Sequence, residues 1–229
     1  MQSPVITNQQ FAAIFDIDIE YSSVLLSRMV AAGDLIRISR GKFALGDTNI
    51  LAISTNIHIP SYVSLWKAFE HHGCTTQMPR VIDVINSKKS GNSSLKTSSG
   101  AYLIKFVKTH PFNIFGFEKV LLDGKTAMIA DREKAIVDGL LFVGQVPVDE
   151  IFSALKSGVD VGKIVGYAAR INKQAVSKRL GFLMDRAGYC VPQNSFPSLS
   201  DTYVPVDPQM PRRGKHHSKW RVMENTVIE

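Results

Sequence analysis

Two helix-forming segments follow one another near the N-terminus, and each repeats its apolar positions with the period of a helix. Thr7 and Gln10 match a capping box, which predicts a helix of about two turns that stops at Asp16. A second helix is predicted from about Glu20 to Ala32, because Gly33 stands in the position of a C-terminal cap. The pattern therefore indicates two short helices joined by a tight turn.

The second predicted helix has two different faces. At 100° per residue, Leu25, Leu26 and Met29 fall together on an apolar face, and mostly small or polar residues fall on the opposite one. Small side chains let a helix backbone approach a surface closely, and hydroxyl groups beside an arginine can contact both phosphates and base edges. The candidate DNA-binding residues of this helix are Ser23, Ser27 and Arg28.

A basic hairpin is predicted directly after the second helix. Leu35–Ile38 and Phe43–Leu45 have the composition of strands, and a turn over Ser39–Lys42 joins them. The order helix, turn, helix and basic hairpin matches the winged helix-turn-helix architecture, in which the second helix lies in the major groove of DNA and the wing reaches the flanking backbone. The candidate phosphate contacts of the wing are Arg37, Arg40 and Lys42.

From residue 51 onward, helical and strand-like patterns are mixed. A helix is predicted from Ser61 to His72, and the polar, Ser-rich run from Asn86 to Gly100 is typical of a loop. Asp123-Gly124-Lys125 lies between two apolar runs and predicts a hairpin, from which we expect an antiparallel sheet. Further strands are expected at 81–85 and 102–107, and further helices at 130–143 and 172–187.

These patterns predict an α+β fold in two parts. Residues 1–50 are predicted to form a winged helix-turn-helix DNA-binding domain. Residues 51–229 are predicted to form a larger mixed α+β domain with an antiparallel sheet.

The charge balance favours a polyanionic partner. Against 20 Asp and Glu, the chain of 229 residues has 27 Lys and Arg, which gives a formal net charge of +7. The last segment is rich in basic residues, and Trp220 is expected to anchor it to the body of the protein. Its candidate contacts with a protein partner or an RNA are Arg212, Arg213 and Lys215.

The sequence also predicts the cellular location of the protein and whether it binds a metal or a cofactor. Cys74 and Cys190 are too few to staple the chain, and no signal peptide or membrane-spanning stretch is evident, so we expect a cytoplasmic protein with no membrane partner. Adjacent helix residues point about 100° apart, so His71, His72 and Cys74 would not converge on one tetrahedral ion. No metal or cofactor is therefore expected.

An enzyme is the main alternative. Asp131, Glu133 and Lys134 together are compatible with a metal-dependent nuclease. However, Glu133 and Lys134 are adjacent and open a helix, in which Asp131 is the natural N-cap and Lys134 pairs with Asp138 four residues on. Motifs of nucleotide-binding loops, serine hydrolases and zinc proteases are lacking. We therefore expect no enzyme, while a protein-docking or RNA-binding module stays open.

Four blocks of the sequence, taken in order, resemble a known family. They are the wing at Gly33–Leu45, the helix at Tyr62–Gly73, the segment Ile129–Asp138 and the run Arg179–Leu183. In this order and spacing they resemble the AbiEi-type antitoxins, winged-helix transcriptional regulators of type IV toxin–antitoxin and phage abortive-infection systems.

The resemblance implies a function for each part of the chain. The N-terminal domain would bind the promoter of its own operon and repress it. The C-terminal domain would counteract a cognate nucleotidyltransferase-like toxin, with direct contact between the two proteins left open.

Overall fold

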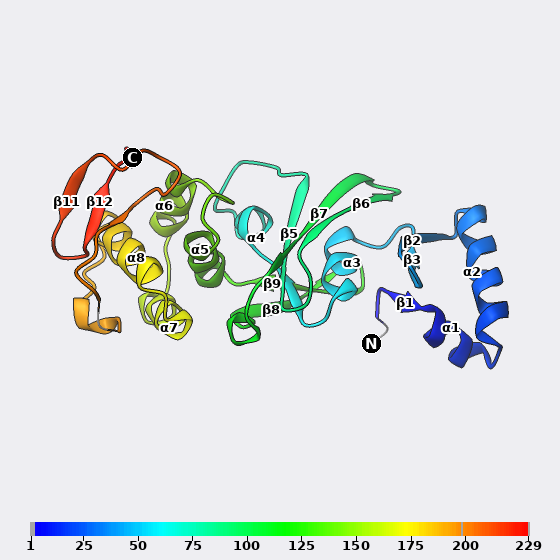
Figure 1. Ribbon diagram of the computed structural model, residues 1–229. Coiled ribbons are helices and arrows are strands. Elements are labelled where there is room, and N and C mark those ends of the chain that lie inside the picture. Colours follow the sequence, from blue (N-terminus) through cyan, green and yellow to red (C-terminus); the bar gives the residue numbers. More distant parts are fainter. Residues whose placement is uncertain (1–2, 198, 229) are drawn as a thin grey trace. The chain divides into compact units, whose positions relative to one another are not determined.

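A computed structural model describes residues 3–197 and 199–228, in which helices combine with three sheets (Figure 1). The α+β class is therefore confirmed. The chain folds into two compact units. The first comprises the residues up to Val63 together with Pro79–Ile114 and Glu118–Ile129. The second comprises Ser64–Met78, Phe115–Phe117 and the residues from Ala130 onward. Residues 1–50 are thus one part of the first unit, and their separate function stays a prediction.

The first unit begins with two helices and a hairpin. Its elements are β1 (Ile6–Thr7), α1 (Asn8–Phe15), α2 (Ile19–Ala32), β2 (Leu35–Ser39) and β3 (Lys42–Leu45). The predicted capping box is present, because Gln10 N donates to Thr7 Oγ1 at 3.2 Å and Thr7 N donates to Gln10 Oε1 at 2.9 Å. α2 ends at Gly33, whose φ of 87° is a left-handed conformation that glycine adopts without strain. Both helices and the hairpin are confirmed.

A small hydrophobic core holds these elements together. Phe11 of α1, Leu26 of α2 and Phe43 of β3 are buried in one cluster, and Leu25 and Met29 pack against it. The apolar face predicted for α2 is therefore the face that packs. The three strands form a sheet in the order β1-β3-β2, so β3 is its central strand.

A six-stranded sheet makes up most of the rest of the first unit. Its order is β6-β7-β5-β4-β9-β8, built from β4 (Ser61–Val63), β5 (Val81–Asn86), β6 (Gly91–Thr97), β7 (Gly100–Lys108), β8 (Phe117–Leu122) and β9 (Lys125–Ala130). Helix α3 (Ile50–Ile57) is tied to this sheet, since Asn56 Nδ2 donates to Thr126 O at 3.2 Å. Asp123 and Gly124 have φ of 49° and 73°, as a two-residue turn of type I′ requires, so the predicted hairpin is confirmed.

The expectation of an antiparallel sheet holds only in part, because the sheet is mixed. β5 pairs with β7 in parallel and β4 pairs with β9 in parallel, alongside the antiparallel pairs β4–β5 and β6–β7. A hairpin signal describes only strands that are neighbours along the chain. The parallel pairs join strands that are separated by other elements. Strand β5 is buried along nearly its whole length, which is typical of a strand inside a sheet.

Two segments form strands where the sequence predicts a helix or a loop, because each pairs with a neighbouring strand of the sheet. Ser61–Val63 is strand β4, and the helix begins only at Leu65. Pairing with β5 and β9 overrides the local helical pattern, as tertiary contacts often do for short segments. Gly91–Thr97, predicted as a loop, is the edge strand β6. Apart from the buried Leu95 its side chains are largely exposed, and their polarity is that of a loop.

The second unit is mainly helical. It contains α4 (Leu65–His71), α5 (Arg132–Leu141), α6 (Val148–Lys156), α7 (Val161–Ile171), α8 (Gln174–Arg186) and a small sheet of β10 (Val204–Pro205), β12 (Val222–Glu224) and β11 (Lys215–His217). Two short 3-10 turns, Pro111–Asn113 in the first unit and Gln193–Ser195 in the second, complete the fold. None of the helices that the structure describes combines the length and hydropathy needed to cross a bilayer.

Trp220 anchors the last segment, as predicted. Its side chain is 1% exposed, and its Nε1 donates to Asp185 Oδ2 at 2.6 Å. The ring lies against Gly181 of α8, where the position of a Cβ atom would be 2.4 Å from two ring carbons. Glycine at this position is what lets the ring approach the helix.

We predict that Gly181→Ala lowers the free energy of unfolding by about 1–3 kcal/mol, because the added methyl group overpacks the Trp220 site. Gly166→Ala is the matched control: Gly166 also lies inside a helix, α7, and apart from its chain neighbours and the backbone of that helix no heavy atom lies within 4 Å of its Cβ position. This substitution should stabilise by about 0.4–1 kcal/mol. Urea unfolding of both variants measures the difference, and equal effects would contradict the packing of Trp220 on Gly181.

Candidate nucleic-acid interface

A hollow of about 520 Å³ opens between the two N-terminal helices and the β2–β3 hairpin. We call it the arginine hollow. It contains four of the six residues predicted to bind DNA, and its lining is Asn8, Ser23, Ser27, Arg37, Arg40, Gly41 and Phe43. The fold thus brings the small, polar face of α2 and two arginines of the hairpin to one place.

The two serines have local hydrogen-bond partners for their protons. Ser23 and Ser27 are one helical turn apart; Ser23 Oγ donates to Ile19 O at 3.0 Å, and Ser27 Oγ donates to Ser23 O at 2.8 Å. Each hydroxyl also accepts a hydrogen bond. Asn8 Nδ2 donates to Ser23 Oγ at 2.6 Å, and Arg37 Nη2 donates to Ser27 Oγ at 3.5 Å. A base edge or a phosphate would therefore replace these exposed, local hydrogen bonds.

Both arginines are exposed, and Arg37 is held in place by contacts of its side chain. The guanidinium carbon of Arg37 lies 5.6 Å from the ring centroid of Phe43, which adds a cation–π contact to its hydrogen bond with Ser27. Arg40 lies in the hairpin turn beside Gly41, and Gly41 O accepts a hydrogen bond from Asn8 N at 3.1 Å. Side chains that are positioned in advance lose less conformational freedom when they bind an anion.

The other two predicted residues do not line this hollow. Lys42 belongs to a different hollow, and its Nζ donates to the carbonyl oxygen of Ile57. Burial, and then the positive charges of Lys88 and Lys89, lower the pKa of Lys42. Arg28 is exposed on α2 outside the lining of the arginine hollow. The structure therefore groups the serines with Arg37 and Arg40, and it places Lys42 and Arg28 elsewhere.

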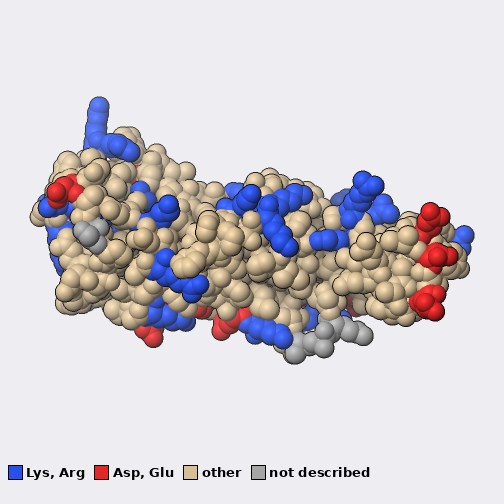
Figure 2. All heavy atoms as spheres, turned by 60° about the horizontal axis from the view of Figure 1, so that its bottom comes forward, with Lys and Arg blue, Asp and Glu red and all other residues tan. Residues whose placement is uncertain are grey.

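Three acidic residues lie at the N-terminal end of α2. Asp16 and Asp18 in the turn before α2, and Glu20 in its first turn, are all exposed. Figure 2 shows acidic side chains gathered over the α1–α2 part of the chain. They suit the positive end of the helix dipole, and they would repel phosphate. A polyanion is therefore favoured at the hairpin and disfavoured at the α1–α2 turn.

The basic residues of the last segment are exposed. Arg212 and Arg213 precede β11, and Lys215 is the first residue of that strand. The strand pairs with β12, where Glu224 accepts hydrogen bonds from Arg186 and His217. The three predicted contact residues thus lie together along the chain and are open to solvent.

The carboxylates of the nuclease alternative serve local structure. Asp131 caps α5, since Lys134 N donates to its Oδ1 at 2.8 Å, and Tyr167 Oη donates to its Oδ2 at 2.8 Å. Lys163 Nζ lies 3.2 Å from Asp131 Oδ2 and 3.0 Å from Glu133 Oε2. The Lys134 ammonium is instead fully buried against Asp138. The three candidate residues therefore do not share one site.

These contacts shift the pKa values of Glu133 and Tyr167. Burial raises the pKa of Glu133, but the backbone N–H of Asp160 and the ammonium of Lys163 outweigh it and hold that pKa below its ordinary value. Burial and the hydrogen bond to Asp131 raise the pKa of Tyr167 to about 12. Hydrogen bonds between α5 and α7 or its N-cap thus lower the pKa of Glu133 and add to the effect of burial on Tyr167.

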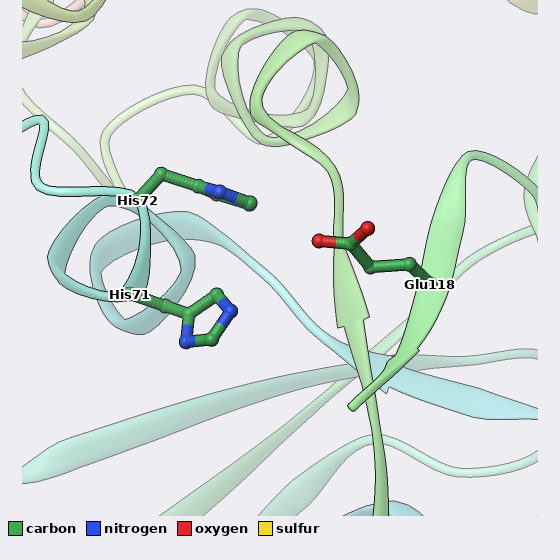
Figure 3. Close-up of side chains that lie close together, drawn as sticks. All are labelled: His71, His72 and Glu118. Carbon is green, nitrogen blue, oxygen red and sulfur yellow. The ribbon is translucent and has the colours of Figure 1, made fainter. Parts of the chain in front are cut away.

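His71, the last residue of α4, and His72, its C-cap, are drawn with Glu118 in Figure 3, and the two imidazole ring centroids are 5.1 Å apart. His72 Nε2 lies 2.8 Å from Ala130 O, to which it donates. The buried Cys74 has Ser157 Oγ at 3.6 Å from its Sγ. His72 and Cys74 thus have separate partners within the second unit.

Sequence reasoning missed Asn8 and Phe43 as parts of the arginine hollow. Asn8 joins the start of α1 to α2, because its amide donates to both Ser23 Oγ and Ile19 O. The one signal at this position is that asparagine is a poor helix former, so its presence in a first turn suggests a specific contact. Phe43 reads as an ordinary core residue, and its role beneath Arg37 follows only from the pairing of β2 and β3.

No family model matches the sequence, and no curated protein matches it. Among solved structures the chain is similar to the crystal structure of the RV2827C protein from Mycobacterium tuberculosis. The TM-score is 0.62 at 10% sequence identity, and the match covers 95% of this chain and 85% of the other. At this identity the likeness shows a shared fold alone.

We predict that Glu133→Gln weakens folding in a pH-dependent way. Folding lowers the pKa of Glu133, so the charged carboxylate stabilises the folded state. This contribution to the free energy of unfolding is fully present above the pKa of the unfolded state, about 4.3, and is lost as the pH falls through the pKa of the folded state. The variant should lose about 1–2 kcal/mol at pH 7 and much less near pH 3. Urea unfolding at both pH values measures this.

Glu150→Gln in the first turn of α6 is the matched control, with a small effect at both pH values. A loss for Glu133→Gln that was the same at pH 7 and pH 3 would contradict the structural role of this carboxylate.

Proposed function

We propose that residues 1–50 form a winged helix-turn-helix that binds double-stranded DNA. α1 and α2 are joined by Asp16–Asp18, a turn of the length typical of such a pair. The β2–β3 hairpin follows α2 directly, and β1 pairs with β3 at the edge of its sheet. This order supports α2 as the helix that enters the major groove and the hairpin as the wing.

The arginine hollow is the observation that carries this proposal. It combines hydroxyl groups on a helix face with two guanidinium groups on the neighbouring hairpin, of which that of Arg37 is positioned by Ser27 and Phe43. Guanidinium groups bind phosphates and guanine edges, and hydroxyl groups contact phosphates and bases alike. We propose that Ser23, Ser27 and Arg28 contact bases, and that Arg37, Arg40 and Lys42 contact phosphates.

A protein-docking role for the same segment has one observation in its favour. Ile14 and Phe15 at the end of α1 are 68% and 59% exposed, and Ile19 at the start of α2 is 47% exposed. Large apolar side chains that are exposed together mark contact surfaces for other proteins. This end of the helices also bears the acidic residues, so it is compatible with a protein partner while the arginine hollow binds DNA.

The resemblance to AbiEi-type antitoxins supports a proposal for the whole chain. In it, the protein acts in the cytoplasm as a repressor of its own promoter and as an antitoxin against a cognate nucleotidyltransferase-like toxin. It works as a binding protein without cofactor or metal. The exposed Arg212, Arg213 and Lys215 are the residues proposed to face the toxin or an RNA.

We predict that Arg37→Ala with Arg40→Ala weakens binding to a duplex from the protein's own promoter. Removing two phosphate contacts should lower the slope of log affinity against log salt by about two units. Fluorescence anisotropy with the promoter duplex at several salt concentrations measures the slope.

Two control variants distinguish a general loss of positive charge from the loss of contacts in the arginine hollow. Lys119→Ala with Lys156→Ala removes the same charge from exposed sites outside the hollow and should leave the slope within the error of wild type. Ser27→Ala removes a hydroxyl but no charge, so it should change the preference among duplex sequences and leave the slope unchanged. If the two arginines behaved like the two lysines, the arginine hollow would not be the DNA-binding site.

We predict that repression and antitoxicity are lost in different variants of the full-length chain. Arg37→Ala with Arg40→Ala should relieve repression of a promoter reporter and still rescue growth when the cognate toxin is expressed from another promoter. Arg212→Ala, Arg213→Ala and Lys215→Ala together should do the reverse. Full-length variants are needed because residues 1–50 belong to the same compact unit as the sheet.

Immunoblots must show equal protein levels in this comparison. Loss of rescue in the Arg37/Arg40 variant would mean that the arginines are also needed for neutralisation, and a wild-type protein that failed to rescue would mean that repression of toxin synthesis is the whole mechanism.

A further inference from the structure

A second hollow of about 280 Å³ lies in the first unit and contains Lys42 in its lining. We call it the lysine hollow. Apart from Ser3, its polar lining comes from the start of α1, the hairpin, the end of α3 and the turn after β5: Thr7, Gln10, Lys42, Asn56, His58 and Lys88. Because Lys42 and Phe43 are successive residues of β3, they point to opposite faces of the hairpin. The lysine hollow and the arginine hollow therefore lie on different sides of the same strand.

The turn after β5 holds two lysines in a fixed place. The buried Asn86 accepts hydrogen bonds at its Oδ1 from Lys88 N at 2.9 Å and from Lys89 N at 2.7 Å. Its Nδ2 donates to Lys89 O at 2.9 Å. One buried side chain thus binds the turn at three points. The backbone that presents Lys88 and Lys89 is ordered before any ligand arrives.

Positive charge gathers here without a matching acid. Among the described residues, none of the ion pairs joins a carboxylate to Lys42, Lys88 or Lys89. The pKa of His58 is lowered by burial and then by Lys42, Lys89 and Lys88, which all disfavour a further proton. Like charges held together repel one another, and an anion with more than one negative charge relieves that repulsion.

We propose that the lysine hollow is a phosphate-binding site, formed by Lys42 and Lys88 with Lys89 beside them and His58 in its wall. Lysine ammonium groups are common phosphate ligands, and three of them suit a doubly charged anion better than a carboxylate. The N-terminal end of α1, where Thr7 and Gln10 lie, adds the positive end of a helix dipole. The phosphate belongs either to a nucleic-acid backbone or to a small phosphate compound.

His58 provides a probe of the site that does not depend on DNA binding. Its imidazole signal, assigned by its loss in His58→Gln, is followed by NMR while inorganic phosphate is added to the full-length protein at constant pH and ionic strength. A bound phosphate should shift the signal to saturation and raise the pKa of His58 by about one unit, because it offsets the positive neighbours. Lys88→Gln with Lys89→Gln should abolish the response. Lys96→Gln with Lys119→Gln, which changes two other exposed lysines of the same unit, should preserve it.

The same variants in the DNA assay identify the source of the phosphate. If Lys88→Gln with Lys89→Gln lowers the salt slope of promoter binding by about two units, the ligand is a backbone phosphate. If His58 responds to inorganic phosphate and the slope is unchanged, the ligand is a small phosphate compound. If neither the His58 signal nor the slope changes, there is no phosphate site. A wild-type protein that bound no duplex would overturn the proposed function, and the His58 titration would still decide this inference.

Discussion

The burial of Phe43 sets which face of the hairpin Arg37 and Lys42 occupy. Phe43 is 3% exposed and lies in the cluster that holds α1, α2 and β2 together. Since residues of a strand alternate between its two faces, a buried Phe43 forces Lys42 to the opposite face. Arg37 is in register with Phe43 on the neighbouring strand, so it shares the side of α2. A shift of one residue in this pairing would exchange the occupants of the two hollows.

Several charges of the first unit are separated along α2 and the hairpin. Asp16, Asp18 and Glu20 lie before and within the first turn of α2, the arginines of the hollow lie beside its middle, and Lys42 lies on the other face of the hairpin. A duplex is therefore attracted at one end of this segment and repelled at the other. Such an arrangement orients a polyanion, which a uniform positive surface with the same net charge would not do.

The elements that could be predicted from the sequence are those with local signals. The Thr7–Gln10 capping box, Gly33 after α2 and the Asp123-Gly124 turn each specify the backbone of a few residues, and each is present in the structure. Strand β4 carries no such signal, because it is defined by its partners β5 and β9.

In the candidate site, too, only the features with local sequence signals could be predicted. The face of α2 could be predicted from helical periodicity, which identified Ser23 and Ser27. The grouping of Lys42 with Arg37 and Arg40 relied on closeness in the sequence. It missed the alternation that a buried Phe43 imposes, and it could not anticipate Lys88, which is brought near by the sheet.

A hairpin with cations on both faces limits how one ligand can contact it. A flat surface on the side of Arg37 cannot at the same time reach Lys42, because the strand lies between them. One nucleic-acid duplex can contact both only if it bends around the hairpin or if the hairpin enters a groove, so that backbones pass on either side. The two hollows otherwise hold different ligands. The start of α1 contributes to both hollows, through Asn8 in one and Thr7 in the other, so occupation of either constrains the same helical turn.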